Sequence, residues 1–288
     1  MSPVANPARA MPSFLEDFRP GARYAGGRRR VTQEDLNAFA ELSGDRHPLH
    51  TDASFAGKAG FQKPLLHGPF GIAAFLGWFF DMGMAQEQLI AMLNSDWRYL
   101  KPVVVGDELS FEMTITRCRR SSAGDRGVVG RHVRIRNQAG ALLQEGRSAL
   151  LVRARGTEPR PALEFFTRAW AAGLGERLST DETFRSATAT WDGAFAIACG
   201  DDEIQFRVFK GQVLEAGQRS PNGPAFIVKA DEIVWVELFT GEENDLMKRA
   251  MQGQLSVSGS AYEYLRLTKA LTVLVDVVRG FYREEVRS

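Results

Sequence analysis

The chain has 288 residues, of which 44% are hydrophobic and 25% are charged, and its formal net charge is +1. This length predicts one or two globular domains with ample apolar material for a core. A net charge so close to zero gives no electrostatic reason for binding nucleic acid or a membrane surface in bulk, so no nucleic-acid partner is expected.

The two cysteines, Cys118 and Cys199, lie far apart and lack the spacing of metal ligands, which is typical of a reduced protein. The N-terminus lacks the apolar stretch of a secretory signal. The longest nearly apolar run, residues 270–278, is too short to cross a bilayer and contains Asp276. These features predict a cytoplasmic protein.

A short helix is predicted to begin after Thr32, whose side chain can cap it, while Glu34 and Asp35 place negative charge in its first turn. The helix leads into residues 43–52, Ser-Gly-Asp-Arg-His-Pro-Leu-His-Thr-Asp. Glycine, proline and serine shape this segment as a loop, and Pro48 fixes the backbone before His50.

The loop carries residues suited to acid–base chemistry. Asp45 precedes His50 by five positions, and His47 and His67 bring three of the four histidines into residues 39–68. A carboxylate and an imidazole on a constrained loop can be directed at one water molecule and can carry its protons. The alternative interpretation is that Asp45 and His50 only cap local turns.

Residues 70–82 predict a helix that starts at Pro69 and is apolar on nearly every side, so it is expected to be buried all round. Four strands are predicted after it, at residues 97–105, 109–115, 129–135 and 142–152, and two of them alternate apolar and polar residues. A curved sheet wrapped around one buried helix accounts for this order.

Two segments carry a resemblance to a known family. Ser43-Gly44-Asp45-Xaa-Xaa-Pro48-Leu49-His50-Xaa-Asp52 and Pro64-Leu65-Leu66-His67-Gly68 resemble the motifs of MaoC-like (R)-specific enoyl-CoA hydratases, which have the hot-dog fold. The Leu100-Lys101-Pro102-Val103-Xaa-Xaa-Gly106-Asp107 stretch is also similar. The family usually has Asn where this chain has His47. The resemblance covers roughly residues 20–155.

The resemblance implies a reaction and a site. Asp45 and His50 would activate a water for syn addition to a trans-2-enoyl thioester. The backbone N–H of Gly68, at a helix N-terminus, would stabilise negative charge on the thioester oxygen. The expected substrate contacts are His47, His67, Phe61 and Leu66. Coenzyme A would enter only as part of the substrate, with no cofactor and no metal.

Residues 155–161 contain Gly156, Pro159 and Pro161 and predict a linker to a second domain at residues 160–288. The expected elements are a helix at 165–173, strands at 187–191, 194–199, 203–209, 225–230 and 253–259, and helices at 242–251 and 261–282. Residues 231–238 fit either a strand or a helix.

Met247 and the run Ala250-Met251-Xaa-Gly253-Xaa-Leu255-Xaa-Val257-Xaa-Gly259 resemble the end of sterol carrier protein type-two domains, which are α+β domains with a lipid tunnel. The resemblance implies a lipid ligand and a tunnel wall formed by Leu267, Leu271, Leu274 and Val278. A solid core is the alternative for the same four side chains.

The predicted fold class is therefore α+β, a hot-dog domain followed by a smaller sterol-carrier-like domain. The two modules occur together in peroxisomal multifunctional enzymes, the family pairing that this chain resembles. A degenerate second hot dog is disfavoured, because a hot dog needs long strands after its helix. One curved sheet leaves an uncovered edge, so a homodimer or larger oligomer is expected. A carrier-protein thioester as substrate and a non-catalytic acyl binder remain alternative functions.

Overall fold

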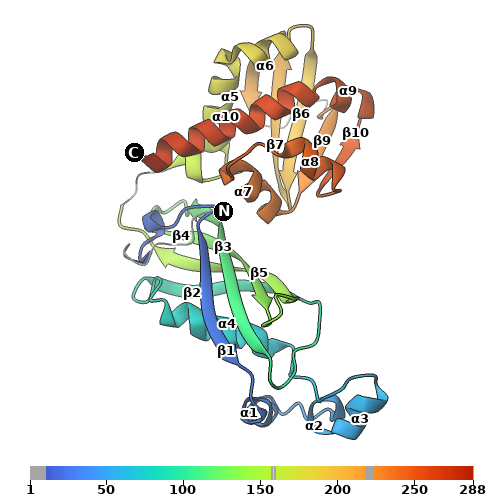
Figure 1. The fold of residues 1–288 in the computed structure, drawn as a ribbon. Helices are drawn as coiled ribbons and strands as arrows, with labels where there is room; N and C mark the ends of the chain where they lie inside the picture. The colour runs from blue at the N-terminus through green and yellow to red at the C-terminus, as the bar shows by residue number, and fades with distance from the viewer. Residues whose placement is uncertain (1–10, 157, 159, 218–222, 288) are drawn as a thin grey trace.

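The computed structural model describes residues 11–156, 158, 160–217 and 223–287. Two α+β domains follow one another along the chain, each built on one five-stranded sheet (Figure 1). The first sheet is antiparallel with strand order β1-β3-β4-β5-β2, and the second has the order β10-β9-β6-β7-β8, in which β6 and β9 are parallel. Among the described residues, no helix has both the length and the apolar character needed to cross a bilayer.

The first domain is a hot dog, a sheet curved around helix α4. Its elements are a 3-10 turn at Leu15–Asp17, β1 (Arg23–Arg30), α1 (Gln33–Ser43), α2 (Pro48–Thr51), α3 (Ala53–Lys58), α4 (Pro69–Asp81), β2 (Leu89–Tyr99), β3 (Glu108–Arg120), β4 (Arg126–Arg136) and β5 (Leu142–Arg153). Helix α1 begins as predicted, because Thr32 and Asp35 form a capping box in which each side chain accepts from the other's backbone N–H.

Helix α4 is buried on one face only, which corrects the expectation of burial all round. Phe70, Phe75 and Phe79 pack against the sheet, and Pro69 begins the helix as predicted. The opposite face is open, and Phe80 on it is 66% exposed. The sheet therefore covers only one side of the helix.

The two edge strands differ most from the predictions. Strand β2 begins at Leu89 and ends at Tyr99, whereas residues 97–105 were expected; residues 100–107 form a loop with one isolated bridge, from Val104 to Leu65. Strand β1 was not predicted at all. Its register shifts between Gly26 and Arg28, and a Cβ at Gly27 would lie 2.5 Å from the Trp78 ring, so these glycines admit α4 close to the strand.

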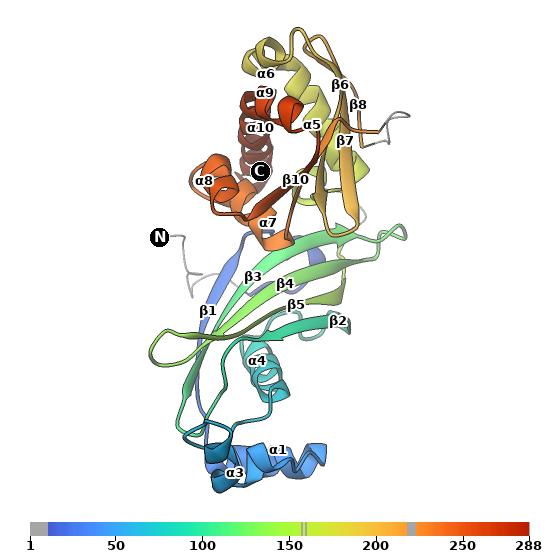
Figure 2. The same ribbon diagram turned by 90° about the vertical axis from the view of Figure 1, so that its right-hand side faces the viewer.

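The second domain places helices on one face of its sheet (Figures 1 and 2). Its elements are a 3-10 turn at Pro161–Leu163, α5 (Arg168–Thr180), α6 (Glu182–Ala187), β6 (Asp192–Cys199), β7 (Asp202–Phe209), β8 (Gln212–Ala216), β9 (Phe226–Ala230), α7 (Glu232–Thr240), α8 (Leu246–Met251), β10 (Leu255–Gly259), α9 (Ala261–Arg266) and α10 (Thr268–Arg287).

Several predictions for this domain were wrong. The helix expected at residues 165–173 is α5, which begins at Arg168 and continues to Thr180, the helix expected at 242–251 begins at Leu246, and strand β8 was not predicted. Residues 187–191 are not a strand: α6 ends at Ala187 and a turn follows, with the Thr188 hydroxyl donating to the Phe184 carbonyl. The long C-terminal helix is divided at Leu267 into α9 and α10. Residues 231–238, which fitted either structure, lie mainly in α7, where Trp235 and Phe239 are buried.

The second domain lies over the outer face of the first sheet, opposite α4 (Figure 2). Charged side chains join the two. Arg117 Nε on β3 lies 2.6 Å from Glu232 Oε1 on α7, and Arg119 Nη2 lies 2.9 Å from Asp202 Oδ2. The Tyr282 hydroxyl on α10 donates to the Pro20 carbonyl at 2.7 Å. These contacts fix one domain against the other at a distance from the loop of Asp45.

Candidate active site

The loop of residues 44–52 is set by local hydrogen bonds. Gly44 ends α1 with φ 73°, a left-handed conformation that glycine adopts without strain. Asp45 Oδ1 then accepts from the His47 backbone N–H at 3.1 Å. The Asp45 side chain stays 53% exposed.

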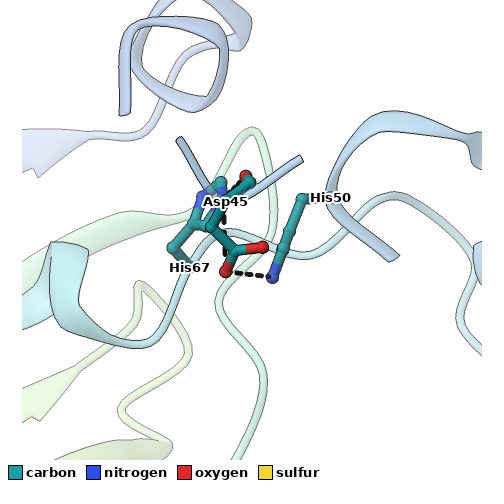
Figure 3. Close-up of side chains that lie close together, drawn as sticks. All are labelled: Asp45, His50 and His67. Carbon is teal, nitrogen blue, oxygen red and sulfur yellow. Dashed lines mark hydrogen bonds and ion pairs between the residues drawn. The ribbon is translucent and has the colours of Figure 1, made fainter. Parts of the chain in front are cut away.

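Asp45, His50 and His67 meet at one point (Figure 3). Asp45 Oδ2 lies 3.8 Å from His50 Nε2 and 4.0 Å from His67 Nε2. The two imidazole rings stack with their centroids 3.8 Å apart. Helix α2 supplies His50 and the segment before α4 supplies His67, so two parts of the chain that are separated in sequence form one cluster.

Carbonyl partners decide which ring nitrogens carry protons in the neutral histidines. His50 Nδ1 lies 2.7 Å from the Leu65 carbonyl oxygen, and His67 Nε2 lies 2.8 Å from the Asp45 carbonyl oxygen. A carbonyl only accepts, so these nitrogens are the donors. His50 Nε2 is then without a proton and faces Asp45. Two acceptors 3.8 Å apart can both bind one water molecule.

Gly68 is the N-cap of α4, and its backbone N–H has no hydrogen-bond partner among the described residues. This N–H is a free donor at the positive end of a 13-residue helix, next to His67 in sequence. A Cβ at this position would lie 2.9 Å from the Tyr99 ring. The close neighbour that requires glycine at this position is therefore Tyr99.

Comparison with known proteins matches both halves of the chain. Residues 18–135 match the MaoC like domain, and residues 174–272 match the SCP-2 sterol transfer family. The (R)-specific enoyl-CoA hydratase of Aeromonas caviae is 30% identical over 122 residues, which are 42% of this chain and 87% of that protein. The chain belongs to the MaoC-like dehydratase family.

Two further relatives define the extent of the likeness. A mitochondrial 3-hydroxyacyl-[acyl-carrier-protein] dehydratase of Arabidopsis thaliana is 33% identical over 81 residues, 28% of this chain and 46% of that protein. The crystal structure of sterol carrier protein 2 is 25% identical, with a TM-score of 0.36, and covers 40% of this chain and 98% of its own. The MaoC-like family consists of hydratases and dehydratases, which are lyases.

Within the MaoC-like domain, the other predicted residues have different surroundings. His47, at the position where the family usually has Asn, caps α2: its Nδ1 accepts from the Leu49 backbone N–H at 3.2 Å. Leu66 is 4% exposed and packs in the domain core, and Phe61 is half-buried. Of the predicted substrate contacts, only His67 joins the cluster of Asp45 and His50.

Two hydrogen bonds that hold the beginning of α4, next to this cluster, were not predicted from the sequence. The Gln144 side-chain amide donates to the Gly68 carbonyl at 3.2 Å, and the Trp97 indole N–H donates to Gln144 Oε1 at 2.9 Å. A Cβ at Gly71 would lie 2.1 Å from Gln144 Oε1. The signal in the sequence was the pair of glycines, Gly68 and Gly71, at the start of a helix. Glycine destabilises a helix, so its presence there indicates that another group packs closely against the backbone.

The same cluster is the one place in the described chain where three potential metal ligands converge, since ligand atoms of Asp45, His50 and His67 lie within 4.8 Å of one another. His67 Nε2 is already engaged by the Asp45 carbonyl, and Nδ1 of His67 is buried. This arrangement suits proton transfer better than three-ligand coordination.

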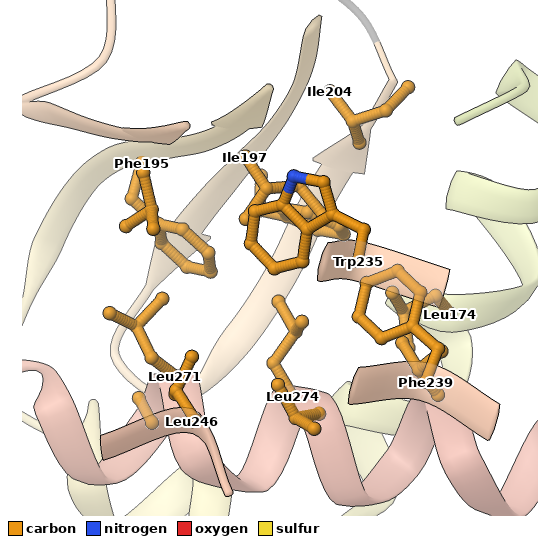
Figure 4. Close-up of a cluster of buried hydrophobic side chains, with 14 of the residues drawn as sticks. Leu174, Phe195, Ile197, Ile204, Trp235, Phe239, Leu246, Leu271 and Leu274 are labelled. Carbon is orange, nitrogen blue, oxygen red and sulfur yellow. The ribbon is translucent and has the colours of Figure 1, made fainter. Parts of the chain in front are cut away.

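The interior of the SCP-2-like domain is closely packed (Figure 4). Leu267, Leu271, Leu274 and Val278, predicted to wall a tunnel, are each at most 4% exposed. The hollow beside them, lined by apolar residues that include Ile197, Trp235 and Leu246, has a volume of about 10 Å³. That is room for about one water molecule. In this conformation the four residues form a solid core.

Proposed function

We propose that the MaoC-like domain adds water to trans-2-enoyl-CoA to give (R)-3-hydroxyacyl-CoA, or catalyses the reverse dehydration. The observation that carries the proposal is the pair of acceptors at one point, Asp45 Oδ2 and the unprotonated His50 Nε2, 3.8 Å apart. A water held by both is oriented for attack. The similarity to the hydratase of Aeromonas caviae supports the same substrate class.

In the proposed mechanism the water oxygen bonds to the β-carbon while His50 Nε2 accepts one of its protons. The water's other hydrogen stays on the oxygen and donates a hydrogen bond to Asp45 Oδ2, which fixes the orientation of the water. The electron pair of the carbon–carbon double bond moves to give an enolate of the thioester. The Gly68 N–H donates to the enolate oxygen. His50 then returns its proton to the α-carbon from the same side, which completes a syn addition.

The main alternative substrate is a thioester on an acyl carrier protein. The same water chemistry serves both thioesters, and one relative is named for the carrier-protein substrate. Turnover of crotonyl-CoA by the full-length protein tests the reaction, and comparison with crotonyl-carrier protein tests the carrier. We expect hydration of crotonyl-CoA. A folded protein that hydrates neither thioester would be a non-catalytic acyl binder, and the proposal would be wrong.

For the SCP-2-like domain we propose that it holds an acyl chain or another lipid. The match to the SCP-2 sterol transfer family over residues 174–272 supports this role, as does the large cluster of buried apolar side chains in the domain. Because the hollow is about 10 Å³ in volume, a ligand can enter only if the surrounding helices move apart. Uptake of a fluorescent fatty acid from solution by the intact protein tests the proposal.

We also propose that two chains associate through β2 and the open face of α4. Strand β2 is an edge of its sheet, and it exposes Leu89, Ile90, Met92 and Leu93 by 39–49%. Phe80 on α4 is exposed as well. A long, apolar, unpaired edge is a template for pairing with another chain.

Light scattering is expected to show a dimer at micromolar concentration, and Leu93→Lys is expected to shift it toward monomer, because a charge on an edge strand opposes pairing. Leu214→Lys is the matched control: Leu214 is 58% exposed on β8, an edge of the other sheet. A wild-type protein that scatters only as monomer would contradict the proposal.

A further inference from the structure

A polar side chain, Gln144, lies in the core of the MaoC-like domain beside the beginning of α4. It is 2% exposed, on the face of β5 that contacts the helix. Burying an amide costs free energy unless its donor and its acceptor are both paired. Here Oε1 accepts from the Trp97 indole N–H at 2.9 Å, and Nε2 donates to the Gly68 carbonyl at 3.2 Å. An indole N–H can only donate, so it fixes which end of the amide is the oxygen and directs the NH₂ group at Gly68.

Two glycines make room for this pair of side chains. A Cβ at Gly71 in α4 would lie 2.1 Å from Gln144 Oε1, and a Cβ at Gly146 in β5 would lie 2.1 Å from the Trp97 ring. Neither glycine has a left-handed backbone, so conformation does not explain them. Glycine destabilises the interior of a helix or a strand. Both elements therefore carry that cost where the Trp97–Gln144 pair needs the space.

The pair holds the first turn of α4, which carries the Gly68 N–H of the proposed mechanism. His67, the residue before it, donates from Nε2 to the Asp45 carbonyl at 2.8 Å. The segment is thus tied to the loop of Asp45 on one side and, through Gln144, to β5 on the other. Gly68 has a helical conformation, with φ −50° and ψ −48°. Because its N–H and its carbonyl belong to one residue, a hydrogen bond that holds the carbonyl also restricts the direction of the N–H.

We propose that Gln144, oriented by Trp97, is a positioning residue: it holds the first turn of α4 so that the Gly68 N–H meets the oxygen of the enolate. Gln144 is buried and acts through Gly68, without touching the substrate. The oxygen carries more negative charge in the enolate than in the bound thioester, so a misplaced donor raises the barrier more than it weakens binding. Loss of the Gln144 amide therefore lowers kcat and leaves KM nearly unchanged. This inference rests on the hydratase reaction proposed above.

Steady-state kinetics of crotonyl-CoA hydration by the full-length protein test the proposal. Gln144→Met keeps the length of the side chain but has no N–H donor. Complete loss of one oxyanion donor costs about 10²- to 10³-fold in kcat, so its misplacement is expected to cost about tenfold or more, with KM within about threefold of wild type. Trp97→Phe keeps a ring but removes the N–H that orients the amide, and it should lower kcat to a smaller extent. Gln205→Met, at a buried glutamine on β7 of the other domain, is the matched control and should leave both constants unchanged.

Gln144→Glu provides a measurement that a purely structural role would not affect. An ionised carboxylate has no donor for the Gly68 carbonyl, whereas a protonated carboxyl group can donate to that carbonyl and still accept from Trp97. Burial raises the pKa of a carboxyl group, so the introduced group gains its proton in mildly acidic solution. The ratio of its kcat to that of wild type at the same pH should therefore rise several-fold as the pH falls from about 8 to about 5. The same ratio for Gln144→Met should not change with pH.

Urea unfolding gives the folded fraction of each variant, to which kcat is normalised. A Gln144→Met protein with the kcat of wild type, or with a raised KM and an unchanged kcat, would overturn the positioning role. So would a ratio for Gln144→Glu that does not change with pH. If Gln144→Met does not fold, Trp97→Phe and Gln144→Glu decide by the same criteria.

The wild-type protein separates this inference from the reaction on which it rests. If it hydrates neither crotonyl-CoA nor the carrier-protein thioester, the hydratase reaction is wrong and the positioning role is wrong with it. If it hydrates crotonyl-CoA and the Gln144 variants do so equally well, only the positioning role is wrong.

Discussion

Replacement of Asp45 by Asn is expected to slow the hydration of crotonyl-CoA by about 10²-fold or more, because the attacking water would lose an acceptor that orients it. The amide keeps the shape of the side chain, and its oxygen can still accept from the His47 backbone N–H. The substitution removes the negative charge. It also places an NH₂ donor at the position of Asp45 Oδ2, which lies 3.8 Å from His50 Nε2. The water would then lose one of its two acceptors. Steady-state kinetics of the purified variant provide the measurement.

His50→Ala is expected to cause a loss of the same order, because it removes the group that accepts the proton. Two neighbouring changes are controls. Asp52→Asn keeps an N-cap for α3, where Asp52 accepts from the Ser54 backbone N–H at 2.7 Å, and His47→Asn restores the usual family residue at the cap of α2. Both should stay within a few-fold of wild type. If Asp45→Asn did so too, Asp45 would have no part in the mechanism.

The pairing of Asp45 and His50 could be predicted from the sequence because the two residues are close together in the chain. Asp45 and His50 are five residues apart, and Gly44 and Pro48 restrict how the backbone joins them. The contacts that assign the protons are not local. His50 donates to Leu65, and His67 reaches back to the Asp45 carbonyl across 22 positions. Spacing in the sequence contains no information about such pairings.

The edge strands were the hardest part of the fold to predict for a related reason. Strands β3 and β4 have one face on the core, so their apolar residues alternate with polar ones, and both were predicted. Strand β2 is exposed along nearly its whole length, so its apolar residues follow no alternation. The burial of α4 was mispredicted for a related reason: its sequence is apolar on nearly every side, but the sheet covers only the side of Phe70, Phe75 and Phe79.

Arg131 is a buried cation that neither the sequence nor the proposed mechanism explains. It lies on the inner face of β4, is 1% exposed, and donates from Nε to Ser148 Oγ at 3.1 Å. Its guanidinium carbon lies 4.4 Å from the ring centroid of Phe79 and 5.1 Å from that of Phe75. Both Nη atoms lack a hydrogen-bond partner among the described residues. Burial lowers the pKa of Arg131 to about 10.

Arg131→Met is therefore expected to raise the free energy of unfolding by about 1–3 kcal/mol. The lowered pKa means that folding disfavours the charged form, by roughly 3 kcal/mol before the contacts with Ser148 and the two rings are counted. Methionine fills similar space without a charge, and its sulfur can contact the aromatic rings. Urea unfolding of both proteins at neutral pH, with comparison of the midpoints at equal slope, gives the difference.

Two further measurements test whether the stability gained by Arg131→Met comes from removal of the buried charge. Arg131→Lys keeps a buried cation but loses the planar group that lies over Phe79, so it should be less stable than wild type. In addition, the folded protein releases the Arg131 proton at a lower pH than the unfolded chain does. Wild-type stability relative to Arg131→Met should therefore rise as the pH increases above about 10. An Arg131→Met protein less stable than wild type at neutral pH would show that the ring contacts and the Ser148 hydrogen bond outweigh the cost of burying the charge.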